Sequence, residues 1–299
     1  MSNRWIKVAC SVIFLVALLW FVDVRFVWAR LQAADMTWIA LALVAITATT
    51  LSMARRWQIV AQSFGIDLSY ARAVREYYLA QLVNLAVPGG VVGDVTRAVR
   101  TRDAVDLKRS AQSVIVERLV GQIYLLGLMF GGFVFILLMP GEVHWAALGW
   151  LVPLTLAVLA LATWKVSRGS SATGRLLHTT LGLLPRFSML VHGAVTTFGL
   201  IFGFYASARA IGVVVPPEAW ATLIPLVLCA MLIPLSIAGW GWREGAAAAL
   251  FPMIGAPASA GVASGITYGL LLMIAVLPAA FILIAQSLPQ NVFSKRKPN

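Results

Sequence analysis

The sequence has 299 residues, of which 61% are hydrophobic and only 11% are charged, and its mean hydropathy is +0.89. A soluble domain is about half apolar and about a quarter charged, so this composition excludes that class, and it excludes a disordered chain as well. The net charge of +12 does not indicate a nucleic-acid-binding protein, because Lys and Arg gather at the ends of apolar segments, as the positive-inside bias predicts. We therefore expect a multi-pass membrane protein with no nucleic-acid partner.

Apolar segments long enough to cross a bilayer, which takes about 20 residues, occur along most of the chain. The six segments cover residues 6–22, 38–54, 111–139, 146–164, 191–209 and 262–285. We expect each to be a transmembrane helix of one all-α domain spanning residues 1–299. The first segment follows basic residues like a signal peptide, but no small-residue cleavage site comes after it, so we expect it to be retained.

The distribution of Lys and Arg predicts how the chain crosses the membrane. Basic residues near both termini place the N- and C-termini in the cytoplasm, and the loop at 140–145, which has no Lys or Arg, lies outside. Both 55–76 and 97–109 are basic, so the apolar segment 77–92 between them must enter and leave from the cytoplasmic side. This charge pattern predicts a re-entrant hairpin.

A second re-entrant hairpin follows from the same reasoning. For the last helix to run from outside to inside, the segment 219–251 must begin and end on the outer side. The two hairpins then enter from opposite faces, within halves that cover about 38–139 and 191–285. This is an inverted repeat with a broken element in each half, an arrangement that places a transporter's substrate site near the bilayer midplane.

The first hairpin combines a helix-breaking sequence with charged residues. Pro88 has no backbone N–H and the glycines after it permit a sharp reversal. Asp94 either caps the helix that follows or serves the site, and Arg97 either lies on the same side or snorkels to anionic head groups. The candidate site residues here are Asn84, Pro88, Gly89, Gly90, Gly93, Asp94 and Arg97.

The second hairpin repeats this combination of a proline, glycines and opposite charges. We expect Trp240 and Trp242 to be anchors at the membrane interface. If the hairpins meet near the midplane, Arg243 should lie within ion-pair reach of Glu117 or Asp94. The candidate site residues are Pro234, Ser236, Gly239, Gly241, Arg243 and Glu244.

Two adjacent charges, Glu117 and Arg118, lie inside an apolar helix. An ion at a helix centre costs about 2.5–3.5 kcal/mol, so both should face protein or water. Neighbouring residues diverge by about 100° on a helix, so we expect separate partners for them, either in a substrate site or in a purely structural ion pair. Gly127 and Gly131 on this helix, and Gly261, Gly265 and Gly269 on another, predict close helix packing; the chain has no metal motif.

Three motifs carry a resemblance to a known family. Pro-Gly-Gly-x-x-Gly-Asp at 88–94, Glu-Arg-x-x-Gly at 117–121 and Pro-x-Ser-x-x-Gly-x-Gly-x-Arg-Glu-Gly at 234–245 occur in order. Together they resemble the flippase-like membrane domain of lysylphosphatidylglycerol synthases, which has stand-alone members. Val92 stands where the family more often has Gly.

The resemblance implies a lipid translocase in the bacterial inner membrane that moves an anionic, aminoacylated or glycosylated lipid between leaflets. Lysine transfer belongs to a separate soluble domain in that family, and only a short basic tail follows residue 285, so we expect no enzyme activity and no cofactor. The arginines at 97, 118 and 243 would attract a lipid phosphate, and the acids would hold those arginines or contact a cationic head group. The alternatives left open are a membrane-embedded enzyme with Asp94 or Glu117 as general base and a non-transporting partner of a lipid synthase or glycosyltransferase. Whether the chain forms a homo-oligomer is also open.

Overall fold

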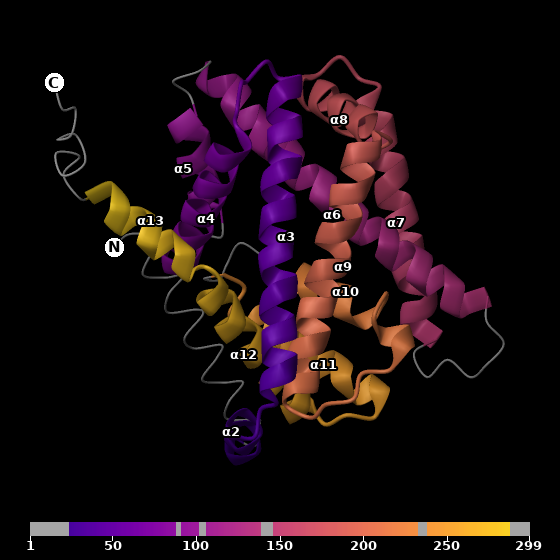
Figure 1. Cartoon of the computed structure of the whole chain (residues 1–299). Coiled ribbons are helices and arrows are strands. Elements are labelled where there is room, and N and C mark those ends of the chain that lie inside the picture. The colour runs from indigo at the N-terminus through magenta and orange to yellow at the C-terminus, as the bar shows by residue number, and fades with distance from the viewer. Residues whose placement is uncertain (1–23, 88–90, 102–105, 139–145, 233–237, 288–299) are drawn as a thin grey trace, which may run out of the picture.

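A computed structural model describes residues 24–87, 91–101, 106–138, 146–232 and 238–287, and every element in these ranges is a helix (Figure 1). The elements are, in chain order, α2 (Val24–Gln32), α3 (Met36–Ser63), α4 (Tyr70–Ala86), α5 (Val92–Thr101), α6 (Leu107–Leu138), α7 (Ala146–Ser167), α8 (Ala172–Leu183), α9 (Phe187–Ala210), η2 (Pro217–Ala219), α10 (Leu223–Ala230), α11 (Trp242–Leu250), η3 (Phe251–Ile254), α12 (Ala258–Ala275) and α13 (Leu277–Ser287).

Within the described residues, five helical stretches are long and apolar enough to cross a membrane: 36–63, 107–138, 148–167, 187–210 and 258–283. They coincide with five of the six expected spans, so the prediction of an all-α integral membrane protein is confirmed. The sixth expected span, 6–22, lies outside the described residues. Large apolar side chains such as Trp150, Leu154 and Leu161 point outward from α7, as expected of a helix surrounded by lipid.

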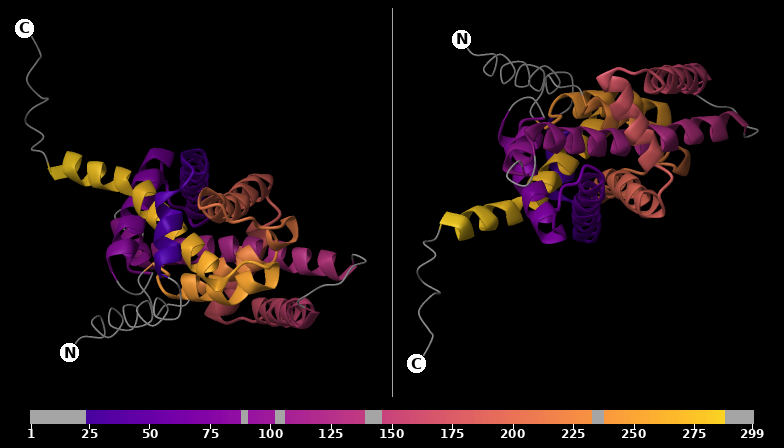
Figure 2. Two further views of the ribbon diagram at one scale, coloured as in Figure 1. Left: turned by 90° about the horizontal axis from the view of Figure 1, so that it is seen from below. Right: turned by 90° about the horizontal axis from the view of Figure 1, so that it is seen from above.

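The centre of the bundle is the pair α3 and α9, which lie side by side along most of their length (Figure 1). The α3 helix begins at Met36 because the Asp35 side chain accepts a hydrogen bond from the Thr37 N–H, at 2.8 Å, and caps its first turn. It ends at Ser63, where Gly65 takes up a φ of +75° that ordinary side chains avoid. The two views of Figure 2 show α7 at one edge of this bundle and α13 projecting from another.

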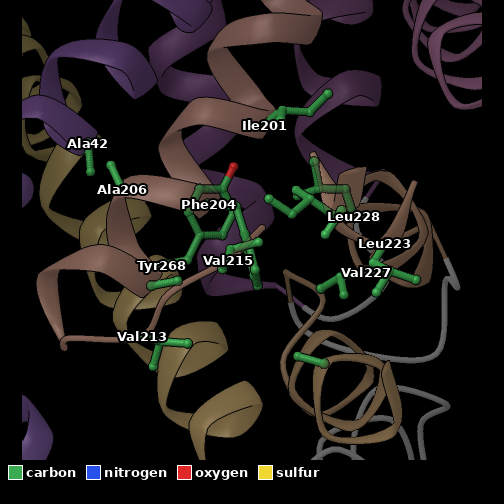
Figure 3. Packing of buried hydrophobic residues seen from close by; sticks show 14 of the residues in the cluster. Ala42, Ile201, Phe204, Ala206, Val213, Val215, Leu223, Val227, Leu228 and Tyr268 are labelled. Carbon is green, nitrogen blue, oxygen red and sulfur yellow. The ribbon is translucent and has the colours of Figure 1, made fainter. Parts of the chain in front are cut away.

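The largest apolar core lies where α9 meets α10, α11 and α12 (Figure 3). Phe204 of α9 is fully buried and packs edge-on against Tyr268 of α12, with ring centroids 5.5 Å apart. Val227 and Leu228 of α10 belong to the same cluster. This core holds the second half of the chain on the central helix pair.

Both segments expected to be re-entrant are helices interrupted at the expected punctuation. The first separates into α4 and α5, which pack on each other, and the second into α10 and α11. Gly239 and Gly241, with φ of +80° and +87°, lead into α11. The other punctuating residues, Pro88, Gly89, Gly90, Pro234 and Ser236, lie outside the described residues. The direction from which each segment enters the membrane stays a prediction, as does the inverted repeat.

Two expectations about the helices need correction. The last apolar segment is not one helix, because it breaks at Val276 between α12 and α13; Pro278 there has no N–H to continue the ladder. Gly127 and Gly131 do not mark a close packing face, since a Cβ atom added at either would meet no atom within 4 Å. The tight approach on α6 is at Gly132, where a Cβ would lie 2.5 Å from the Ala221 carbonyl oxygen.

Candidate functional site

A fully buried carboxylate, that of Glu117 on α6, lies at the centre of the candidate site. Arg56 of α3 donates to its Oε1 from Nε at 3.1 Å and from Nη2 at 2.5 Å. Arg97 of α5 donates to Oε2 from Nη2 at 2.9 Å, and the hydroxyl of Tyr77 on α4 donates to the same oxygen at 3.1 Å. One carboxylate thus ties four helices together.

Asp94 extends this network toward the half-exposed Arg118. Arg97 Nη2 lies 3.0 Å from Asp94 Oδ1, and the Arg118 guanidinium forms an ion pair with Oδ2 of the same carboxylate. The expectation that Glu117 and Arg118 find separate partners is confirmed, because their side chains leave α6 in different directions. We call the five charged residues Arg56, Asp94, Arg97, Glu117 and Arg118 the arginine–acid network.

Aromatic rings complete the surroundings of Arg97, which is only 1% exposed. Its guanidinium carbon lies 4.8 Å from the ring centroid of Trp57 and 4.5 Å from that of Tyr77. The indole N–H of Trp57 donates in turn to the Ser113 hydroxyl at 3.3 Å. Rings at these distances attract a desolvated cation, so they hold the arginine in place as well as shielding it from water.

The start of α5 is built by Asn84 and Gly93. Asn84 Oδ1 accepts a hydrogen bond from the Gly93 N–H at 2.7 Å, which satisfies a backbone donor of the first turn. A Cβ at Gly93 would collide with the backbone of Ala80, so glycine here permits α4 and α5 to approach closely. Asp94 is therefore not the helix cap: α5 begins at Val92, and the Asp94 carboxylate is engaged with arginines instead.

A cavity of ≈ 220 Å³ opens beside the network. Its walls come from α3, α4, α5, α6 and α9, and they include four members of the network, Arg56, Asp94, Glu117 and Arg118. The rest of the lining is mixed: it includes the apolar side chains of Met53, Leu125 and Leu200 and the uncharged polar side chains of Gln81, Asn84, Gln122 and Thr196. The cavity therefore places buried charges beside both polar and apolar side chains.

Several polar atoms near this cavity are buried without a hydrogen-bond partner among the described residues. They include the Nη1 atom of Arg56, the Oε1 atom of Gln122 and the Oγ1 atom of Thr196, all on lining residues. Buried polar groups are normally paired, since leaving one alone costs about 1–3 kcal/mol. Asp94 Oδ2, also on a lining residue, has no hydrogen bond either, but it forms the ion pair with Arg118. Apart from this paired oxygen, the lining offers the Arg56 donor and two uncharged polar groups to whatever occupies the space.

The second charged motif forms a separate buried cluster. Arg243 and Glu244 of α11 are both fully buried and pair with each other, with Arg243 Nη2 2.5 Å and Nε 2.9 Å from Glu244 Oε1. Glu244 Oε2 also accepts from the Gly241 N–H at 2.6 Å, which is the glutamate half of a capping box and satisfies the N-cap donor at the start of α11.

Glycines of α12 admit this pair, so the expected packing of the Gly261, Gly265 and Gly269 face is confirmed. A Cβ at Gly265 would lie 3.2 Å from Glu244 Cγ, and a Cβ at Gly269 would collide with the Arg243 guanidinium. The Trp240 ring packs on Arg243, its centroid 5.1 Å from the guanidinium carbon, and the place of Trp240 and Trp242 at the membrane interface stays a prediction.

The expected ion pair between Arg243 and Glu117 or Asp94 is wrong. A long arginine side chain folds back onto its sequence neighbour, and that local pair leaves no need for a distant acid. The described cavity is correspondingly not shared between the two broken segments, since its lining includes no residue of α10 or α11.

Three residues of the site are not among those predicted from the sequence: Arg56, Trp57 and Tyr77. Arg56 is counted there as a loop charge because hydropathy ends the span at 54, whereas α3 continues to Ser63 and Arg56 is 2% exposed. The sequence signal that could have indicated a buried Arg56 is its position directly after an apolar segment, in a chain that also has an acid within another apolar segment. Among the described residues, no group of three His, Cys, Asp or Glu side chains could hold a metal ion.

Residues 4–280 match the transmembrane region of lysylphosphatidylglycerol synthases, so the chain belongs to this family. The resemblance of the three motifs is thereby confirmed over nearly the whole length. No curated protein sequence matches the chain significantly.

Proposed function

We propose that this member of the lysylphosphatidylglycerol synthase transmembrane family is a lipid translocase that moves a polar head group between leaflets. The observation that carries the proposal is the ≈ 220 Å³ cavity in which buried charges lie beside apolar side chains such as Met53, Leu125 and Leu200. A lipid presents the same combination, a charged head on an apolar body. Membership of a family linked to lipid metabolism supports this substrate class.

The charged side chains of the network can replace the interactions with water that a polar head group loses when it enters the membrane. An ionised group at the centre of a hydrocarbon layer costs at least about 2.5–3.5 kcal/mol, so its passage needs polar partners inside the protein. Arg118, whose side chain is 41% exposed, lies at the accessible end of the network, and Arg56 at its buried end. A phosphate entering the cavity would meet Arg118 first and Arg56 further in.

The broken helices would allow the cavity to open alternately to one side of the membrane and to the other. We propose that 77–98 and 219–251 are re-entrant from opposite faces, in an inverted repeat with both termini cytoplasmic in the bacterial inner membrane. In such repeats, alternating access comes from movement of one half against the other around the site. Lipids are then the partners of this protein. An additional lipid-modifying enzyme or a second copy of the chain would act on the same cargo.

The contacts of the two acids favour translocation over membrane-embedded catalysis. A general base must be available to take a proton from a substrate within hydrogen-bond reach. Glu117 already accepts from two arginines and a tyrosine, and Asp94 lies between two arginines. The oxygens of both carboxylates are therefore already engaged with donors, so we propose no enzymatic role for them.

The test is a leaflet assay in proteoliposomes containing a fluorescent phospholipid, read by the fraction that an added reductant can bleach. We expect the purified chain to accelerate exchange over protein-free liposomes, and Arg118→Gln to remove most of that acceleration. The matched control is Arg175→Gln, which removes an exposed arginine of α8 outside the cavity. Exchange no faster than in protein-free liposomes would overturn the proposal, as would an Arg118→Gln variant as active as the control.

A further inference from the structure

We propose that the cavity selects a net-anionic lipid, with a phosphate and an uncharged hydroxyl-bearing head group, over an aminoacylated lipid with an ammonium group. The inference rests on the proposed function in taking the cavity as the head-group site. It goes further by naming the charge class of the cargo. Three features of the lining carry it: the charge balance of the network, the occupancy of its acids, and the chemistry of its unpartnered atoms.

The charge balance of the network is positive. It holds three arginines, Arg56, Arg97 and Arg118, against two carboxylates, Asp94 and Glu117, which leaves a net charge of +1. Four of the five residues line the cavity, and Arg97 pairs directly with both acids. In a site with little water such an imbalance is weakly screened, so it attracts an anion and repels a cation.

Neither acid of the network is available to a cationic head group. Both oxygens of Glu117 accept hydrogen bonds, Oε1 from Arg56 and Oε2 from Arg97 and Tyr77. Each oxygen of Asp94 lies against an arginine. A lysyl ammonium would have to displace one of these arginines, leaving a buried cation without its partner, which is the costly way to break a buried pair.

The unpartnered atoms fit a phosphate and hydroxyl groups. Arg56 Nη1 is buried with no acceptor among the described residues, and guanidinium N–H groups bind phosphate oxygens through strong charge-assisted hydrogen bonds. Gln122 Oε1 and Thr196 Oγ1, buried and also without partners in the described part of the chain, can accept from hydroxyls of the head group. The cavity of ≈ 220 Å³ far exceeds the ~30 Å³ share of one water molecule, so a group of several heavy atoms fits.

Gln122 provides a direct test because glutamate has nearly its shape. Gln122→Glu would bring the network to charge neutrality and add a carboxylate that no arginine already holds. The control is Gln112→Glu, an identical change on the same helix at a position outside the cavity. The measurement is lipid affinity of the purified protein by native mass spectrometry. The probes are phosphatidylglycerol, lysylphosphatidylglycerol and soluble glycerol 3-phosphate, and leaflet exchange of the two lipids is measured in parallel.

We expect the unmodified protein to bind phosphatidylglycerol at least about tenfold more tightly than lysylphosphatidylglycerol, a ratio that one nearby unit charge readily produces. Gln122→Glu should reduce or reverse this ratio, while Gln112→Glu leaves it unchanged. Equal affinities, a preference for the aminoacylated lipid, or a ratio that Gln122→Glu does not alter would each overturn the inference.

The binding and exchange measurements together distinguish a failure of this inference from a failure of the proposed function. Preferential binding of phosphatidylglycerol without leaflet exchange supports the charge selection and overturns translocation. Exchange that favours lysylphosphatidylglycerol supports translocation and overturns the selection. Glycerol 3-phosphate binding as tightly as the lipid supports the phosphate chemistry but assigns it to a soluble ligand, which overturns the lipid as cargo.

Discussion

Removal of the charge at Glu117 is the sharpest perturbation that the structure offers. Glu117→Gln keeps the size of the side chain but removes the carboxylate that pairs with Arg56 and leaves the Arg97 guanidinium with Asp94 alone. Breaking a buried ion pair from one side typically costs about 3–5 kcal/mol, because an uncompensated charge stays behind. We expect a loss of folding free energy of this size, since both arginines are at most 2% exposed.

The assay is equilibrium unfolding in mixed detergent micelles, with Glu218→Gln as control because Glu218 is exposed. The double variant Glu117→Gln with Arg56→Gln removes one charge of each sign and restores the original net charge, so it should recover a substantial part of the loss. A cost for Glu117→Gln below about 1 kcal/mol, as is usual for an exposed pair, would refute the reasoning. So would a double variant less stable than the single one by the full cost of Arg56→Gln alone.

Other predictions concern glycines and topology. Gly121→Ala should slow leaflet exchange, because its Cβ would lie 2.6 Å from the Arg56 guanidinium; Gly127→Ala on the same helix, in open space, should leave exchange unchanged and raise stability by up to about 1 kcal/mol. Gly93→Ala should lower the unfolding temperature, whereas Gly127→Ala should not, because a Cβ at Gly93 would collide with a backbone carbonyl; equal unfolding temperatures of the two variants would contradict the close approach of α4 and α5. Single cysteines at Glu142 and Ser294 should react with a membrane-impermeant maleimide in intact cells only at Glu142; outside labelling at Ser294 would contradict the cytoplasmic C-terminus.

The sequence predicts the helices well because their signal is local. Apolar stretches, prolines and glycines mark five described spans and both interrupted segments, with bounds within a few residues except at the end of α3, which continues to Ser63. The separate partners of Glu117 and Arg118 are predictable too, because helix geometry alone directs neighbouring side chains apart. In these cases the determining physics lies within a few residues of the position in question.

The partners of buried charges are not predictable in this way. In the sequence, Arg56 looks like a charge in a loop. Only the packing of α6 beside α3 shows that Glu117 is the partner with which Arg56 is buried inside a helix that continues to Ser63. For Arg243 the prediction fails in the opposite way, because a distant acid is expected but the partner is the next residue in the sequence. The Arg243 side chain is long enough to fold back onto Glu244. Pairing depends on which helices touch and on rotamers, and neither leaves a periodic signature in the sequence.

The two charged clusters are built in the same way but differ in their access to a cavity. In each, an arginine pairs with a glutamate and a glycine makes room for the guanidinium, Gly121 for Arg56 and Gly269 for Arg243. The pair on α11 is fully buried, and its acid also accepts a hydrogen bond at the start of its own helix. Arg243 Nη1 has no hydrogen-bond partner among the described residues, but the guanidinium lies against the rings of Trp240 and Tyr268, away from the described cavity. The network around Glu117 instead runs from a buried arginine to a half-exposed one, and four of its five residues line a cavity. Both clusters join helices through a buried arginine and glutamate, but of the two only the network around Glu117 also borders the described cavity that we propose as the head-group site.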